Sequence, residues 1–122
     1  TEIYTLSLHD ALPIWKRMEK HIVVYCTTPS NEVAVAIAES LVPGRLAACV
    51  NIVGGISSIY TWKGELCREE ECLMIIKTRR ELFERLRERI VSLHPYEVPE
   101  IVAIPIMSGH VPYLDWIDES TG

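Results

Sequence analysis

Two long runs of strand-forming residues, joined by Lys63-Gly64, constrain the fold of this chain more than any other feature. The first run covers residues 46–62 and is interrupted by Gly54-Gly55, which predicts a β-bulge or a bend. The second run covers residues 65–78, and the short turn makes it the hairpin partner of the first. Its residues 72–76 are all apolar, so both faces of this strand need cover. The chain must therefore fold around one long antiparallel hairpin.

Patterns on either side of the hairpin complete a βαββαβ order with a closing helix. The expected elements are a strand at 21–26, a helix that Thr28 or Ser30 caps and Pro43-Gly44 ends, a helix at 80–93, a strand at 101–106 and a short helix at 111–119. This order predicts an α+β, ferredoxin-like fold (split βαβ), an antiparallel sheet with helices on one face. Since the hairpin is apolar on both faces, the helix-free face needs cover from another subunit, and we expect an oligomer.

Composition and charge limit the classes of function. The 122 residues are 48% hydrophobic, which is enough for one globular domain, and the net charge of -5 argues against nonspecific binding to nucleic acid or an anionic membrane. Apolar runs stay below the roughly 18 residues that suggest a membrane span. The four cysteines form no C-x-x-C pair, which favours a reducing, cytoplasmic location.

The first seventeen residues differ from the rest of the chain. They carry Pro13 and the polar break His9-Asp10, and residues 7–14 resemble peptides translated from sequencing-adapter DNA. They also precede Met18, a natural start position just ahead of the first clear strand. We therefore expect residues 1–17 to be a non-native extension and residues 18–122 to be the single functional domain.

The stretch His94-Pro95-Tyr96-Glu97-Val98-Pro99-Glu100 predicts a rigid turn that presents polar groups. Each proline fixes its own φ and holds the preceding residue, His94 or Val98, in an extended conformation. The side chains of His94, Tyr96 and Glu100 therefore have defined directions. Because these residues include an imidazole, a phenol and a carboxylate, the turn is a candidate binding site.

Two chemistries compete for such a site. Cys26, Cys49 and His94 are thiol and imidazole groups that suit copper or zinc, and the end of the first strand is one place where they can meet. Glu71 and Lys77 share one strand face, and Tyr60, Trp62 and Trp116 add aromatic walls, which indicates a pocket for a small polar molecule. No G-x-S-x-G, H-E-x-x-H or P-loop signature is present, so we do not expect an enzyme.

Several segments resemble the CutA family of divalent-cation tolerance proteins. The segments that carry the resemblance are Leu46-Ala47-Ala48-Cys49-Val50-Asn51, Ser58-Ile59-Tyr60-Thr61-Trp62-Lys63-Gly64, Ile76-Lys77-Thr78, His94-Pro95-Tyr96-Glu97-Val98-Pro99-Glu100 and Tyr113-Leu114-Asp115-Trp116. They occur in the family's order and span about residues 20–119.

The resemblance implies a homotrimer assembled through edge strands of the long hairpin, similar to the trimers of PII signalling proteins. It also implies tolerance of copper and other divalent cations, with copper(II) or another divalent cation bound through Cys26, Cys49 and His94 and with no organic cofactor.

Two other roles remain open. A PII-like sensor would bind a small organic ligand in an intersubunit cleft, through Glu71, Lys77 and the aromatic residues together with Tyr96 and Glu100. Alternatively, the trimer would serve as a structural scaffold for a protein partner whose identity the sequence does not indicate.

Overall fold

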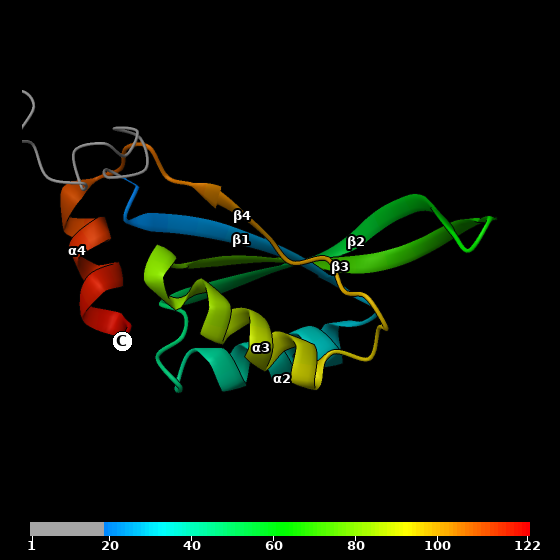
Figure 1. The fold of residues 1–122 in the computed structure, drawn as a ribbon, viewed down its shortest axis with the longest axis horizontal. Coiled ribbons are helices and arrows are strands. Elements are labelled where there is room, and N and C mark those ends of the chain that lie inside the picture. Colours follow the sequence, from blue (N-terminus) through cyan, green and yellow to red (C-terminus); the bar gives the residue numbers. More distant parts are fainter. Residues whose placement is uncertain (1–18) are drawn as a thin grey trace, which may run out of the picture.

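The computed structural model describes residues 19–122, so the predicted extension at residues 1–17 lies outside the described part. In chain order the elements are β1 (His21–Thr28), α2 (Asn31–Leu41), β2 (Cys49–Trp62), β3 (Glu65–Arg79), the 3-10 helix η3 (Arg80–Leu82), α3 (Phe83–Leu93), β4 (Val102–Pro105) and α4 (Val111–Ser120) (Figure 1). The strands form one antiparallel sheet in the order β2-β3-β1-β4. This confirms the predicted α+β, ferredoxin-like fold.

The β2–β3 hairpin is the longest element and projects beyond the rest of the sheet (Figure 1). Its register shifts between Val53 and Ile56, and Gly55 lies there at φ 72°, so the predicted bulge is present. Lys63 and Gly64 both have positive φ, which is the pattern of a tight type I′ turn. Because β1 pairs only with residues 72–79 of β3, the outer half of the hairpin is a two-stranded arm.

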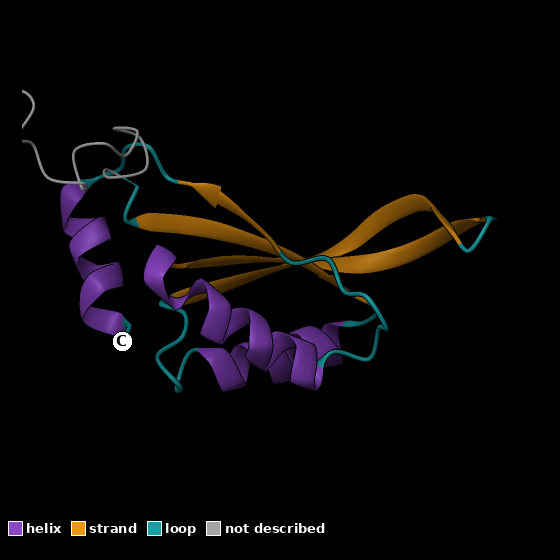
Figure 2. Ribbon diagram, viewed as in Figure 1, coloured by secondary structure: helices purple, strands orange, loops and turns teal. Residues whose placement is uncertain are grey.

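Both long helices cover one face of the sheet (Figure 2). Helix α2 begins where the Ser30 hydroxyl accepts a hydrogen bond from the Val33 N–H at 3.2 Å, as one of the two predicted caps. Alternate residues of β1 and β3 meet the apolar stripes of α2 and α3 in a core that contains Ile22, Val24, Cys26, Ala34, Ile37, Leu41, Met74, Ile76, Leu86 and Ile90. Each large side chain there contributes about 1.5–3 kcal/mol by leaving water.

The opposite face of the sheet carries apolar side chains that neither α2 nor α3 covers. Val102 and Ile104 of β4 lie opposite Tyr25 and Val23, which point away from the core. The side chains of Val102 and Ile104 are nearly half exposed, as is that of Val53 on the same face of β2. The apolar, helix-free face that we expected is therefore present in this subunit.

The sequence misplaced two element boundaries. Residues 46–48 precede β2 instead of forming its start, because the N–H groups of Leu46 and Ala47 donate to the Leu41 carbonyl and close the end of α2. The helix predicted from residue 80 begins as η3, and α3 follows at Phe83. Both segments join a helix to a strand, and the tighter connections satisfy backbone groups that a regular element would leave unpaired.

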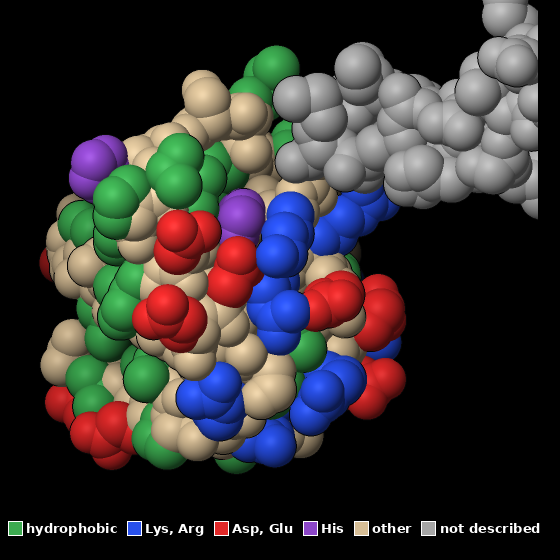
Figure 3. Space-filling view, turned by 90° about the vertical axis from the view of Figure 1, so that its left-hand side faces the viewer, with side chains coloured by type: hydrophobic (Ala, Val, Ile, Leu, Met, Phe, Trp, Pro, Cys, Tyr) green, Lys and Arg blue, Asp and Glu red, His purple; other side chains and the backbone are tan. Residues whose placement is uncertain are grey.

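Helix α4 closes the end of the sheet away from the hairpin tip (Figure 1). Ile117 is fully buried, and Asp118 holds Lys20 at 3.1 Å and the His21 ring at 2.9 Å. These partners lower the pKa of Asp118 although partial desolvation opposes them. Acidic and basic side chains lie side by side on this end of the molecule (Figure 3). Within residues 19–122, no helix has the length and apolar character needed to cross a bilayer.

Candidate functional site

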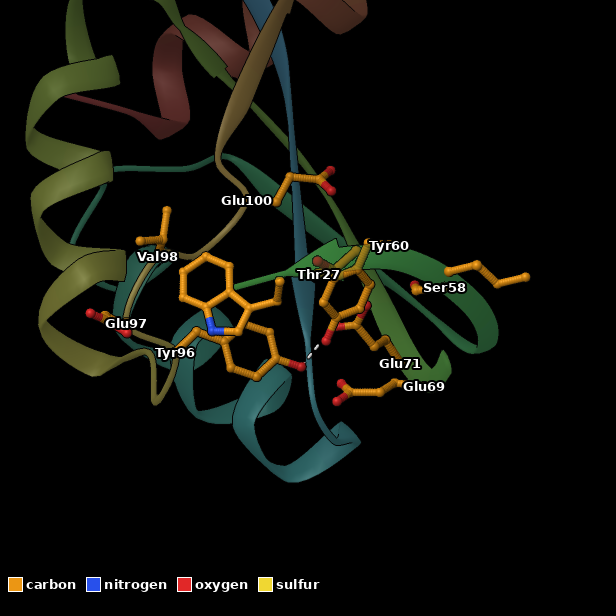
Figure 4. A pocket seen from close by; sticks show the side chains of 11 residues that line it. Thr27, Ser58, Tyr60, Glu69, Glu71, Tyr96, Glu97, Val98 and Glu100 are labelled. Carbon is orange, nitrogen blue, oxygen red and sulfur yellow. Dashed lines mark hydrogen bonds between the residues drawn. The ribbon is translucent and has the colours of Figure 1, made fainter. Parts of the chain in front are cut away.

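A cavity of about 570 Å³ lies between the hairpin arm, the end of β1 and the proline-bounded turn (Figure 4). It is lined by Thr27, Ser58, Ile59, Tyr60, Trp62, Glu69, Glu71, Tyr96, Glu97, Val98 and Glu100, and we call it the hairpin cavity. Five of the seven ligand-binding residues expected from the sequence line it, namely Tyr60, Trp62, Glu71, Tyr96 and Glu100. Its volume is in the range of small-molecule sites.

His94 anchors the proline-bounded turn to the sheet. Its side chain is buried, Nε2 lies 2.8 Å from the Thr27 carbonyl, and Nδ1 lies 3.1 Å from the Tyr96 N–H. Because Nδ1 accepts from that N–H, the network assigns the proton to Nε2, which donates to the carbonyl. Both ring nitrogens are therefore used within the fold, and they fix the direction in which Tyr96 points.

The Tyr96 hydroxyl points to Glu71, a buried carboxylate that lines the cavity. The hydroxyl donates to Glu71 Oε2 at 2.6 Å, and Glu71 is 6% exposed. Desolvation, this hydrogen bond and the nearby carboxylates of Glu71 and Glu69 raise the pKa of Tyr96. Desolvation and a hydrogen bond to Glu69 likewise raise the pKa of Tyr60 to about 12. The two phenols therefore stay protonated and act as donors to carboxylates.

Lys77 and Trp116 lie outside the hairpin cavity, although we expected them in the same pocket as Glu71. Lys77 does share the strand face of Glu71, but six residues separate them along β3, which is about 20 Å. The Lys77 ammonium instead donates to Asn51 Oδ1, and the ring of Trp116 lies 5.5 Å from that of Tyr113 on α4. The two residues therefore belong to a different end of the sheet.

The structure does not bring the three predicted metal ligands together: Cys26 Sγ and His94 Nε2 lie 3.8 Å and 2.8 Å from the Thr27 carbonyl, whereas Cys49 lies elsewhere on the sheet. Cys26 points into the core and is fully buried, whereas Cys49 is half-buried and lies across from Lys77 on the opposite face of the sheet. Cys26 pairs with Met74, three residues from Lys77 along β3, so the two cysteines are also offset by about 10 Å. Burial and the charges of Glu100 and Glu71 raise the pKa of Cys26 to about 12.

These three side chains therefore do not fit one metal ion within a single subunit. No group of three His, Cys, Asp or Glu side chains anywhere in residues 19–122 is placed to hold a metal. Among the three candidates, Cys49 alone is accessible, and its Sγ lies 3.9 Å from Asn51 Oδ1.

Sequence reasoning missed several residues of the two regions. Glu69 shares the strand face of Glu71 because it lies two residues earlier on β3, so the period-2 pattern could have identified it. Tyr113 of α4 lies close to Cys49. Desolvation is the main cause that raises the pKa of the Tyr113 hydroxyl, and the neighbouring Cys49 thiol adds to it. That contact joins α4 to β2, and no local sequence pattern predicts it.

The strand order, the helices on one face and the projecting hairpin define a ferredoxin-like α+β protein with a cavity at the base of the arm. The family model described as CutA1 divalent ion tolerance protein matches residues 22–120. The chain therefore belongs to the CutA1 family of divalent ion tolerance proteins.

Curated relatives agree with this assignment. The chain is 56% identical over 100 residues to the divalent-cation tolerance protein CutA of Thermus thermophilus, a match that covers 82% of this chain and 97% of that protein. It is 49% identical over 100 residues to the chloroplastic CutA of Arabidopsis thaliana, covering 82% of this chain and 55% of that protein. The chain thus spans nearly all of the bacterial relative and about half of the plant one.

Solved structures share the fold. The Thermus thermophilus protein superposes with a TM-score of 0.82 at 55% identity, covering 84% of this chain and 99% of that chain. CutA1 of Oryza sativa gives a TM-score of 0.83 at 45% identity, with 86% and 96% covered. An Archaeoglobus fulgidus structure, described as a periplasmic divalent cation tolerance protein, gives 0.80 at 45% identity, with 82% and 97% covered.

Proposed function

We propose that this chain forms a homotrimer that binds a divalent cation, with copper(II) the first candidate, as part of the response to metal ions. Membership of the divalent ion tolerance family supports the metal, and the uncovered apolar sheet face supports the assembly. The role is binding and not catalysis, and the four free cysteines favour a cytoplasmic setting.

The observation that carries this proposal is the position of Cys49. Its thiol is partly accessible, beside the amide oxygen of Asn51 and near Tyr113 of α4, on the face of the sheet opposite α2 and α3. Because residues 19–122 of one subunit supply no three-ligand group, the ion must draw further ligands from a second subunit. Cys26 and His94, which are buried and hydrogen-bonded, act as structural residues in this arrangement.

The test is an anaerobic calorimetric titration of copper(II) and zinc(II) into the reduced trimer. Cys49→Ser is expected to weaken the affinity at least tenfold, which is about 1.4 kcal/mol. Cys67→Ser is the matched control, since Cys67 is also a half-buried thiol on the same hairpin but lies at the arm. Light scattering on each variant shows whether the assembly is intact. Equal affinities of the two variants would exclude Cys49 as a ligand.

A second function is supported by the hairpin cavity itself. Its volume, its aromatic residues and its few polar groups fit a small organic ligand, as expected of a PII-like sensor. The arm that walls the cavity projects from the rest of the chain (Figure 1), which supports a site at an intersubunit cleft of the proposed trimer. In this arrangement a bound ligand contacts the trimer interface and can change its packing. A trimer that binds neither metal nor ligand would act as a scaffold for another protein.

A further inference from the structure

The charge of the hairpin cavity is of one sign. Its eleven lining residues include four glutamates, and none is a lysine, an arginine or a histidine. Glu97 forms an ion pair with Lys63 at 3.5 Å, but both side chains are about 70% exposed, so the pair compensates little charge. Glu69, Glu71 and Glu100 have no ion pair with any residue in 19–122. The cavity is therefore a site of negative potential.

Glu71 shows that this charge faces the cavity. The side chain is more than nine-tenths buried, and its one hydrogen-bond partner within the described chain is the Tyr96 hydroxyl, on Oε2. Glu71 Oε1 has no hydrogen-bond partner within residues 19–122. Every fully buried side-chain oxygen in these residues has one, so Oε1 is not fully buried and is accessible from the cavity that Glu71 lines. In Figure 4, Glu69 and Glu71 lie beside the rings of Tyr60 and Tyr96. A buried carboxylate with a free oxygen calls for a cationic partner.

Neighbouring groups respond to the same field. The carboxylates of Glu71 and Glu69 add to desolvation in raising the pKa of Tyr96, and those of Glu100 and Glu71 do the same for Cys26. Each of these groups becomes negative when it loses its proton, so the shared direction follows from uncompensated negative charge nearby. An anionic metabolite entering the cavity would meet the same repulsion.

The remaining walls of the cavity suit an organic cation better than a metal ion. Tyr60 and Trp62 are each about 40% exposed beside the carboxylates, and aromatic faces attract ammonium groups. The four glutamates do not form a metal-binding group, because no three acidic, histidine or cysteine side chains in residues 19–122 are close enough to share an ion. Glu97 lies toward Val98, away from Glu69 and Glu71 (Figure 4). The carboxylates therefore lie at separate positions around the cavity (Figure 4).

We propose that the hairpin cavity binds an aliphatic di- or polyamine, whose separated ammonium groups pair with Glu71 and Glu100 while its methylene chain lies against Tyr60 and Trp62. This inference rests on the proposal that the cavity binds a small organic ligand, and it names the ligand class. The methylene spacers gain from contact with the rings, and each ammonium pairs with a carboxylate that has no ion pair within residues 19–122.

Calorimetric titration of spermidine into the intact protein tests this directly. We expect saturable binding that weakens at least tenfold in Glu71→Gln and in Glu100→Gln. Glu39→Gln is the matched control, since it removes the same charge from an exposed position on α2 outside the cavity. Glu100 is exposed, so Glu100→Gln keeps the test informative if Glu71→Gln fails to fold. Light scattering and thermal unfolding confirm that each variant is intact.

Two further probes separate the ligand class from the cavity function. Inorganic triphosphate carries the opposite charge, and 1,8-octanediol has a similar aliphatic chain without charge. Equal spermidine affinities in Glu71→Gln, Glu100→Gln and Glu39→Gln would overturn the inference, because diffuse attraction to an acidic protein would then explain the binding. Absence of spermidine binding would overturn it as well. In that case, octanediol binding that Glu71→Gln weakens would leave the organic-ligand function standing, whereas triphosphate binding would contradict the negative potential of the cavity.

Discussion

Replacing Tyr96 with phenylalanine removes one hydroxyl from the hairpin cavity and nothing else. That hydroxyl donates to Glu71 Oε2 at 2.6 Å, and Glu71 is 6% exposed. Hydrogen bonds to charged groups contribute about 1.5–3 kcal/mol, and leaving a buried acceptor unpaired costs a similar amount. Because Tyr96 is itself only partly buried, water can replace part of the bond, and we expect a loss of about 2 kcal/mol in the free energy of unfolding.

The assay is urea unfolding followed by circular dichroism, at one fixed chain concentration because the apparent stability of an oligomer depends on concentration. Tyr25→Phe is the matched control, since the Tyr25 hydroxyl has no side-chain hydrogen bond within residues 19–122 and the ring lies on the uncovered face. The midpoint is expected to fall for Tyr96→Phe with an unchanged slope. A loss below about 0.5 kcal/mol, or an equal loss in Tyr25→Phe, would refute the reasoning.

Three further predictions concern the fold. Ile37→Ala is expected to lose about 2–5 kcal/mol in urea unfolding, because Ile37 is fully buried between α2 and the sheet. Gly55→Ala is expected to cost about 1 kcal/mol more than Gly54→Ala, since Gly55 alone of the two has a positive φ, and equal costs would contradict this. Raising the pH is expected to destabilise the protein, because the pKa values of Tyr60 and Tyr96 are higher in the folded chain than in the unfolded chain. The resulting stability is complete below pH 10, the pKa of an unfolded tyrosine. It is lost as the pH rises through the folded-state pKa, which is about 12 for Tyr60. Tyr60→Phe should flatten that decline in a pH series of unfolding curves.

The sequence predicted the fold well because its signals are local and agree with one another. Gly54-Gly55 indicated a bulge or bend, Lys63-Gly64 indicated the turn, and Ser30 was one of two candidate caps for α2. Boundaries failed at residues 46–48, where apolar composition resembles a strand. There the backbone instead closes α2, because the N–H groups of Leu46 and Ala47 donate to the Leu41 carbonyl and are not available to pair with a neighbouring strand. Residue type alone does not carry that information.

The candidate site was predicted only in part, because it depends on which strands become neighbours. The proline-bounded turn indicated that Tyr96 and Glu100 would be presented, and both line the cavity. Strand parity correctly put Glu71 and Lys77 on one face, but the position of the turn decides that only Glu71 borders the cavity. Sequence patterns likewise did not show that Cys26 and Cys49 lie on opposite faces of the sheet, because this follows from how β1 and β2 pair with β3.

Native mass spectrometry of the reduced protein equilibrated with zinc(II) tests the central claim most directly, because it counts chains and ions in one spectrum. We predict a species of three times the 13.9 kDa chain mass that carries one or three ions. A threefold assembly allows a single site on its axis or three equivalent sites between subunits. The ions are expected to be lost in Cys49→Ser while the trimer persists. A monomer, or a trimer that retains the same ions without Cys49, would contradict the proposed metal site.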